Sequence, residues 1–569
     1  MKGKKILSTF LALLLLANLP VSALAADWDI GSGDITVNAG SGGQTVTQGS
    51  QVDVPDSAPV IKGSSTKNTV TINAEKDQTA NVTLSGATID VITEGKAAVS
   101  TTGEGNVSIE LDGDSTLKSG FTHAGLEKNN GGSLTIADED KNGKLTVEGG
   151  NYGAGIGGGY NGTGSDITIS GGEVKATGGA YGAGIGGGWV GSGSDITISG
   201  GEVKATGGAF GAGIGGGWRG SGSDITISGG EIKATGGGNG AGIGGGWGGS
   251  GSDIAISGGE VNATGGNYGA GIGGGGGGSG SDITISGGEV NATGGYAGAG
   301  IGGGCNSAGS DITISGGEVN ATGGQHGAGI GGGQNGSGNN IAISGGEVKA
   351  TSGENGAGIG GGCFGDGNNI TVSGDAKLKV QGGVEDNTDG AGAGIGNGGS
   401  KADGSPIPGA EVAPDTSDLT TGRIEYYAPG ADMEKDNPTR TTVGASSQPE
   451  KPTDPGAEHG ADAPLYRVTD QDGKDIAHKA ERKDGVLTIT VDADLAILTG
   501  KLSSIDTLKR QGIEKIVFVT NKAASTFQAA DLLEKGASSD EYRLTHDGTT
   551  VTFVVSEKET DVSGILIQP

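Results

Sequence analysis

The sequence has few of the residues that build a conventional globular core. Aromatic residues make up 4% of the chain and hydrophobic residues 32%, whereas 129 of the 569 residues are glycine. Lys and Arg number 36 against 66 Asp and Glu, which gives a formal net charge of −30. This charge argues against nucleic acid and anionic membrane surfaces as direct partners. Glycine does not recur at every third residue, which excludes collagen.

Long apolar runs are missing after the N-terminus, so we expect no membrane insertion by the mature chain. At the N-terminus, three lysines precede the apolar run Ile6–Leu16, and Ala23-Leu24-Ala25 fits a cleavage site. This pattern is typical of a secretory signal. The sequence therefore predicts a signal peptide at residues 1–25 and a secreted, extracellular protein, either released or held at the cell surface.

A strict repeat overrides the low-complexity composition. The segment Gly-Ala-Gly-Ile-Gly-Gly recurs every 29 residues, with its Ile at positions 156, 185, 214, 243, 272, 301, 330 and 359. Each unit contains three short alternating stretches, which in the first unit are Gly153–Gly157, Asp166–Ser170 and Glu173–Thr177. Period-two alternation turns two apolar residues of each stretch to one side. The repeat predicts an all-β fold, a right-handed parallel β-helix with 29-residue coils whose interior only a stack can bury.

The regular coils occupy residues 149–400. Residues 26–148 alternate in the same way without the strict period, which predicts irregular N-terminal coils and a cap. Prolines concentrate in residues 401–461, which we interpret mostly as a linker, although 423–427 has the pattern of a strand.

Residues 462–569 have an ordinary composition and form a separate module in this interpretation. We expect strands at 486–491, 515–519 and 550–555 and helices at 503–511 and 527–535. The pattern predicts a small C-terminal α/β or α+β domain, and it contains no recognisable functional motif.

The chain has only two cysteines, Cys305 and Cys363. They occupy the same repeat position two coils apart, with Gln334 between them. Coils stacked at strand spacing would hold them roughly 10 Å apart, whereas a disulfide needs Cα atoms within about 7 Å. We predict two free thiols.

Most of the scarce aromatic residues fall into two columns of the repeat. The first column is Tyr160, Trp189, Trp218 and Trp247, and the second is Tyr152, Tyr181, Phe210 and Tyr268, which Asn239 interrupts. Between them runs the glycine-rich stretch, so we expect a shallow groove with a floor that lacks side chains. Aromatic faces bind the C–H faces of sugars, which makes these eight residues candidate contacts for a linear polysaccharide. The alternative is that the rings stack on one another and shield the turns.

An acidic column is the candidate metal site. It consists of Asp166, Asp195, Asp224, Asp253, Asp282 and Asp311, and Asn340 and Asn369 continue it. Carboxylates stacked at strand spacing repel one another, and Ca²⁺, the only cofactor that the pattern suggests, would relieve this repulsion. The alternative is an Asx-type turn, in which Asp and Asn both accept a backbone N–H.

Support for catalysis is weak. The five histidines neither recur nor pair with Ser or Cys at a known spacing, and Arg219 is the only Arg of the regular coils. A polysaccharide lyase needs a basic residue to abstract a proton. A Glu column that begins at Glu173, with Lys or Asn two residues on, indicates a solvated charged face. We therefore expect a protein that is not an enzyme.

Two sets of motifs resemble known families. The Gly-Ala-Gly-Ile-Gly-Gly-Gly and Asp-Ile-Thr-Ile-Ser-Gly-Gly units resemble secreted glycine-rich repeat proteins of Gram-positive, largely clostridial, bacteria. The segments Val82-Thr-Leu-Ser-Gly86, Val107-Ser-Ile-Glu-Leu111 and His123-Ala-Gly125 resemble the bacterial β-helix carbohydrate-binding domain. This resemblance covers about residues 30–400. It implies a non-catalytic module that binds plant cell-wall polysaccharides with Ca²⁺ involved, and it carries no ligand residue over to this chain.

Three hypotheses follow from the sequence. The first is a monomeric, secreted carbohydrate-binding β-helix, whose partner is a plant cell-wall or host glycan. The second is a structural surface stalk or adhesin that holds the C-terminal module away from the cell. The third is a polysaccharide lyase.

Overall fold

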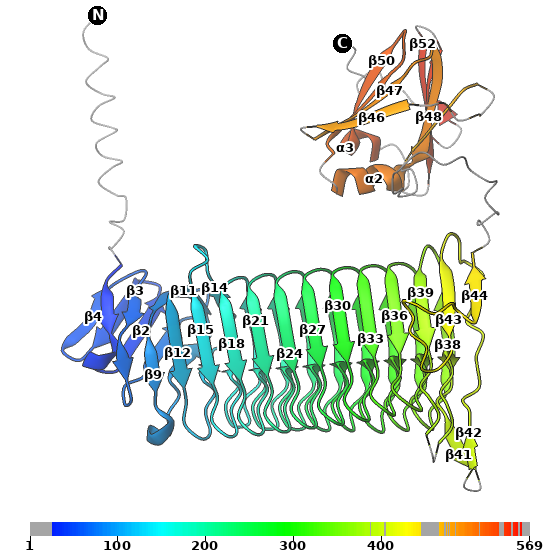
Figure 1. The fold of residues 1–569 in the computed structure, drawn as a ribbon. Coiled ribbons are helices and arrows are strands. Elements are labelled where there is room, and N and C mark those ends of the chain that lie inside the picture. The colour runs from blue at the N-terminus through cyan, green and yellow to red at the C-terminus, as the bar shows by residue number, and fades with distance from the viewer. Residues whose placement is uncertain are drawn as a thin grey trace, which may run out of the picture. The chain divides into compact units, whose positions relative to one another are not determined.

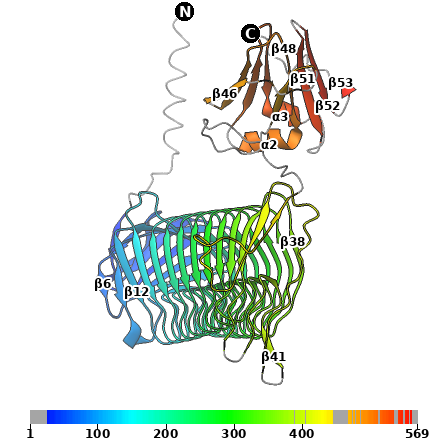
Figure 2. The ribbon, with the colours of Figure 1, turned by 45° about the vertical axis from the view of Figure 1, so that its right-hand side comes forward.

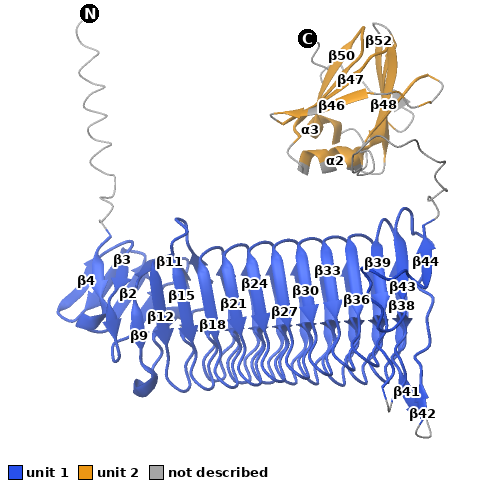
Figure 3. Cartoon of the chain, in the orientation of Figure 1, with its two compact units in different colours: residues 1–449 blue, residues 450–569 orange. Residues whose placement is uncertain are grey.

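The computed structural model describes residues 25–386, 389–402 and 405–444, and residues 466–559 except 472–473, 475, 477, 484, 511–512, 534–539, 548–549 and 556–557. The chain divides into two compact units, residues 1–449 and 450–569 (Figure 3). Residues 1–24 of the predicted signal peptide and 445–461 of the predicted linker lie outside the described residues.

Unit 1 is a parallel β-solenoid (Figure 1, Figure 2). Three sheets of 13, 15 and 14 strands run along its length. The first regular coil contributes β16 (Ile156–Gly157), β17 (Gly164–Ile169) and β18 (Glu173–Thr177), one to each sheet. The pattern continues to β37 (Ile359–Gly360), β38 (Gly367–Val372) and β39 (Lys377–Gln381). The predicted β-helix with 29-residue coils is confirmed.

Equivalent residues of successive coils pair in register. Ile156 pairs with Ile185, Ile167 with Ile196, and Glu173 with Glu202. The apolar residues of each coil are fully buried, and one continuous core extends from Trp28 to Tyr426. Because an isolated coil could not bury these residues, the stack itself creates the core.

Glycine is required where the backbones of successive coils meet. A Cβ on Gly179 would lie 1.8 Å from the carbonyl oxygen of Gly150, and a Cβ on Gly208 would lie 1.6 Å from that of Gly179. Gly186 has a φ of +128°, in the region that favours glycine. The abundance of glycine therefore follows from close packing of the turns.

The N-terminal coils keep the three-sheet plan with variable lengths. Ile35 pairs with Val70, Val70 with Val99, and Val99 with Leu126. These coils supply β1 (Asp27–Asp29), β5 (Val60–Lys62), β6 (Ser64–Ser65), β7 (Val70–Ala74), β8 (Thr79–Ser85), β9 (Thr88–Asp90), β10 (Val99–Gly103), β11 (Asn106–Asp112), β12 (Asp114–Lys118), β13 (Leu126–Lys128), β14 (Leu134–Ala137) and β15 (Lys144–Glu148).

An antiparallel meander extends the 15-stranded sheet at its N-terminal end. β2 (Ile35–Gly40) pairs with β7 on one side and with β3 (Gly43–Gln48) on the other, and β4 (Gln51–Pro55) follows. Trp28 is buried nearby, and its indole N–H donates to Asp56 at 2.8 Å. This end of the solenoid is thereby closed.

The C-terminal end differs from the predicted linker, because residues 405–444 belong to unit 1. β43 (Arg423–Tyr427) extends the 14-stranded sheet beside β39, and β44 (Arg440–Val443) pairs with it antiparallel. β40 (Ile395–Gly396) ends the 15-stranded sheet, and β41 (Ser400–Ala402) and β42 (Ser405–Ile407) form a hairpin. Tyr426 packs on the core, with the Arg440 guanidinium over its ring. Proline suits the loops of a cap as well as a linker, so composition did not separate the two.

Unit 2 is an α+β module with two sheets. The first contains β45 (Arg467–Thr469), β48 (Leu495–Lys501), β51 (Glu541–Asp547), β52 (Thr550–Val555) and β53 (Lys558–Glu559). The second contains β46 (His478–Lys483), β47 (Val486–Val491), β49 (Lys515–Val519) and β50 (Ala524–Gln528). Its helices are α2 (Leu502–Arg510) and α3 (Ala529–Leu533). The three predicted strands are present, and α3 begins later than predicted because β50 includes residues 527–528. No helix in the described part of the chain has the length and apolarity of a membrane span.

The close approach of the coils yields a matched pair of substitutions. A Cβ on Gly237 would lie 1.6 Å from the carbonyl oxygen of Gly208, whereas one on the adjacent Gly238 would meet nothing nearer than 3.7 Å. We expect Gly237→Ala to lower the free energy of unfolding of unit 1 by about 3 kcal/mol or more, and Gly238→Ala to change it by less than about 0.5 kcal/mol. Denaturation followed by circular dichroism measures both, and equal effects would contradict the proposed packing.

Candidate functional site

The two aromatic columns lie on the turns that flank the two-residue strands of the 15-stranded sheet. The second-column residue of each coil accepts a backbone hydrogen bond from the first-column residue of the next coil. The Trp189 N–H donates to the Tyr152 carbonyl at 2.8 Å, and Trp247 donates to Phe210 in the same way at 2.8 Å. The two turns of adjacent coils therefore touch, and they bring the two columns together.

The rings form one continuous surface. Tyr160 stacks on Trp189 with centroids 4.8 Å apart, and Trp189 stacks on Trp218 at 5.6 Å. Rings of the second column stack similarly, and contacts such as that of Tyr152 with Tyr160, at 5.4 Å, join the columns. We call the linked residues the aromatic strip: Phe121, Tyr152, Tyr160, Tyr181, Trp189, Phe210, Trp218 and Trp247.

This arrangement replaces the predicted open groove. Residues 153–159 are all buried, so the glycine-rich stretch is not an exposed floor between the columns. Tyr268 is 47% exposed and has no ring contact within the described residues, because Asn239 and Gly276 interrupt the columns beside it. Phe121 was missed, because it precedes the regular coils and no repeat position marks it.

Rings inside the strip are stacked on their neighbours, and the rings at the ends of the first column are more exposed. Trp189 and Trp218 are half-buried between stacked neighbours. Trp247 is 44% exposed, and the next coil has Gly276 at its position. Tyr160, at the other end of the first column, is 46% exposed. The Arg219 guanidinium lies 4.5 Å from the centroid of the Trp218 ring, a cation–π contact.

The acidic column has a backbone explanation. Asp166 has a φ of +54°, the other five aspartates have φ between +52° and +55°, and Asn340 and Asn369 both have +53°. Asp and Asn tolerate this left-handed conformation better than other residues with a side chain. Ser165 and Ile167 pair with the next coil, whereas Asp166 is left out of the register. The column thus repeats because a backbone kink repeats.

The carboxylates that gather closely are elsewhere. The described residues contain one group of His, Cys, Asp or Glu side chains that could hold a metal, and it consists of Glu110, Asp138 and Asp140, with ligand atoms within 4.8 Å of one another. This group was not foreseen from the sequence, although Asp138-x-Asp140-x-Asn142-Gly143 matches the first half of a calcium loop. These oxygens suit a hard cation, but both Asp138 oxygens already accept the N–H groups of Asn142 and Gly143, at 3.2 and 3.0 Å.

The two cysteines are free, as predicted, and the structure shows that both are buried. Gln334 lies between them, and its Oε1 is 3.9 Å from the Cys305 sulfur. Burial raises the pKa of both thiols, that of Cys363 to about 12. Because the thiolate is the nucleophile, neither residue is suited to catalysis at neutral pH.

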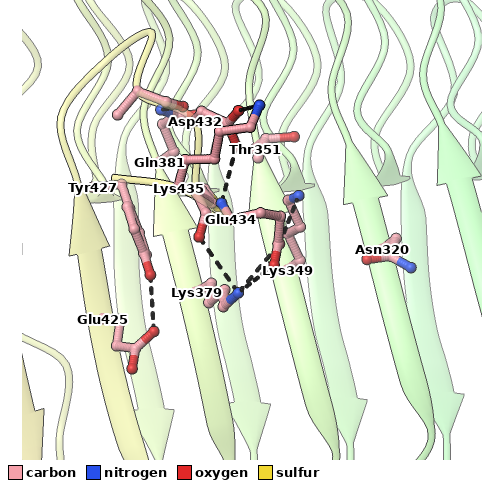
Figure 4. A network of polar contacts seen from close by, with 12 residues as sticks. Asn320, Lys349, Thr351, Lys379, Gln381, Glu425, Tyr427, Asp432, Glu434 and Lys435 are labelled. Carbon is pink, nitrogen blue, oxygen red and sulfur yellow. Dashed lines mark hydrogen bonds and ion pairs between the residues drawn. The ribbon is translucent and has the colours of Figure 1, made fainter. Parts of the chain in front are cut away.

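A network of charged residues covers the end of the 14-stranded sheet (Figure 4). Lys379 and Lys349 both contact Glu434, at 3.1 and 3.4 Å, and these contacts lower the pKa of Glu434. Lys377 pairs with Glu347 at 2.8 Å. A pocket beside this network is lined by four cationic residues, Lys349, Lys377, Lys379 and Arg423, and by four anionic ones, Glu318, Glu347, Glu425 and Glu434. Exposed pairs of this kind contribute little stability, and here they attach the loop between β43 and β44 to the sheet.

A Ser–His contact in unit 2 was not foreseen from the spacing. The Ser525 hydroxyl lies 2.8 Å from His546 Nε2, and the Thr520 hydroxyl lies 3.3 Å from Nδ1. Ser525 is 2% exposed and His546 is fully buried, so no substrate can reach them. Burial lowers the pKa of His546 to about 4. We interpret this group as a structural network.

Comparison with protein families identifies the repeat. A family described as "Beta helix repeat" matches residues 167–189, 196–218, 225–247, 254–276, 283–305, 312–334 and 341–363. Each match ends at the first aromatic column or its equivalent position. Comparisons with curated proteins and with solved structures give no match. The regular coils of this chain therefore consist of β-helix repeats, in agreement with the solenoid fold.

The buried His546 makes the stability of unit 2 depend on pH. Its folded-state pKa is about 4, below the ordinary 6.5, so its contribution is complete above pH 6.5 and is lost as the pH falls toward 4. We expect the free energy of opening of β51, the strand that carries His546, to fall by up to about 1.4 kcal/mol per pH unit. Hydrogen exchange between pH 6.5 and 5 measures this slope. His546→Gln should flatten it, and an equal slope in that variant would contradict the assignment.

Proposed function

We propose that this β-helix repeat protein is a secreted, non-catalytic carbohydrate-binding protein whose ligand contacts the aromatic strip. One observation carries the proposal: a chain with 4% aromatic residues gathers eight rings on adjoining turns and leaves them partly exposed. Aromatic rings combine large apolar area with a specific geometry, and contiguous exposed apolar surface of this kind is typical of binding sites.

The charge of the protein favours a neutral glycan. A formal net charge of −30 repels polyanions such as uronic-acid-rich polysaccharides at long range. Binding to a neutral polysaccharide through rings and hydroxyl groups needs no opposite charge. We therefore place neutral plant cell-wall or host glycans ahead of acidic ones.

The stacked geometry restricts how the sugar binds. Ring faces inside the strip are covered by their neighbours, so a glycan that follows the strip meets ring edges and stacks on ring faces only at the ends. Trp247, next to Gly276, offers one such face. This differs from a row of coplanar platforms, and it makes the end residues the main contributors to affinity.

A structural spacer is the second candidate function, favoured by the ring-on-ring stacking. Each aromatic pair contributes about 0.5–1.5 kcal/mol beyond its buried area, so the strip would stabilise the turns without a ligand. The two functions differ in whether removal of the rings changes glycan binding or only stability.

Affinity electrophoresis of the full chain in gels that contain hydroxyethylcellulose or galactomannan tests the proposal. We expect retardation of the wild type, and at least tenfold weaker retention when Trp189, Trp218 and Trp247 are all changed to Ala. Phe364→Ala, which removes a ring that is 42% exposed on a distant coil, is the matched control and should bind like the wild type.

Two further outcomes decide between the alternatives. Unchanged retention of the triple variant, or a wild type that no gel retards, would favour the spacer. Retention should persist in EDTA, because rings need no cation. Loss of binding in EDTA would contradict a site made of rings alone and would favour a metal-dependent site at Glu110, Asp138 and Asp140.

A further inference from the structure

The N-terminal end of the aromatic strip adjoins a polar pair. His123 Nδ1 lies 2.8 Å from Glu127 Oε2. The same oxygen accepts the Ala124 N–H at 3.0 Å, and the other carboxylate oxygen accepts the Asn129 amide at 2.8 Å. Glu127 is only 7% exposed, and these three hydrogen bonds fix its carboxylate in place.

This pair fixes the orientation of the imidazole. An ionised carboxylate only accepts hydrogen bonds, so Nδ1 is the protonated nitrogen that donates to Glu127. In the neutral ring Nε2 is then an acceptor. Within the described residues Nε2 has no hydrogen-bond partner, and the His123 side chain is 33% exposed. Nε2 is thus available to a hydroxyl group from outside.

The pair lies beside the end of the strip. The Tyr160 N–H donates to the Thr122 carbonyl at 2.7 Å, and a Cβ on Gly159 would lie 2.6 Å from Glu127 Oε2. The Phe121 ring meets Tyr152 edge-on with centroids 4.9 Å apart, and Phe121 is 57% exposed. The exposed rings of Phe121 and Tyr160 and the oriented acceptor, His123 Nε2, therefore lie on two adjoining turns.

His326, farther along the same face, shows the contrast. It occupies the second-column position of its coil, but it is only 8% exposed. Its Nε2 contacts the Tyr296 hydroxyl at 2.9 Å, and its Nδ1 contacts Asn355 at 3.0 Å. Both of its nitrogens are engaged within the protein, so His326 is structural, whereas His123 is engaged on one side only.

We propose that Phe121, His123 and Tyr160 form a subsite for one neutral hexose residue. The sugar ring lies against the exposed aromatic surface, and one of its hydroxyl groups donates to His123 Nε2. Glu127 is a positioning residue that holds the imidazole. This inference rests on the proposed function. It places one sugar contact at the N-terminal end of the strip, where His123 adds a hydrogen-bond acceptor. The buried Glu127 carboxylate disfavours a uronic acid at the same place by repulsion.

The test uses the full chain in the neutral-polysaccharide gels described above. We expect His123→Ala to weaken retention three- to tenfold, which is the range for loss of one hydrogen bond. His123→Gln, whose terminal amide can place an oxygen near the Nε2 position, should recover part of the loss. The matched control is Gln325→Ala, which changes an exposed polar residue on a distant coil and should bind like the wild type.

The outcomes separate this inference from the proposed function. If the tryptophan triple variant loses binding while His123→Ala and Tyr160→Ala bind like the wild type, the subsite is wrong and the function stands. A wild type that binds polygalacturonate more tightly than the neutral gels would overturn the neutral class. Thermal unfolding of each variant checks the fold, and a loss of binding by His123→Gln equal to that of His123→Ala, at unchanged melting temperature, would contradict the acceptor role.

Discussion

The structure depends on in-register hydrogen bonding between parallel coils whose backbones approach too closely for side chains at the turns. Each coil of the regular part pairs residue for residue with the next, as Ile156 does with Ile185. At Gly179 and Gly208 a Cβ would overlap the carbonyl oxygen of the preceding coil. This constraint explains how a glycine-rich chain forms regular coils, because the entropic cost of fixing glycine is offset by continuous backbone pairing and a buried aliphatic core.

The same register turns single residues into columns and limits what the columns can do. Because the Trp189 N–H bonds to the Tyr152 carbonyl, the turns of adjacent coils interlock and the two aromatic columns merge into one strip. Rings spaced by one strand separation cover one another's faces. The more exposed rings therefore lie where the regularity stops, at Trp247 beside Gly276 and at Tyr160 next to the turn that carries His123.

Repetition alone is a poor guide to function in this fold. The Asp column recurs coil after coil because each member takes a left-handed backbone conformation that Asp and Asn accept. Two close groups of polar side chains, His123 with Glu127 and Glu110 with Asp138, lie instead in the irregular N-terminal coils, whereas the regular coils hold the buried structural group of His326, Tyr296 and Asn355. These coils are not bound to one turn length, so their loops can bring distant side chains together.

The sequence by itself determined the period, the buried face of each strand and the separation of Cys305 from Cys363, because alternation and a constant step define the geometry of a stacked coil. It also indicated strands β47, β49 and β52 of unit 2. Only the tertiary structure decided that the aromatic columns touch, that Phe121 joins them, that residues 405–444 cap the solenoid, and that His546 meets Ser525. These features depend on how loops of different coils or strands meet in space, and no local pattern encodes that meeting.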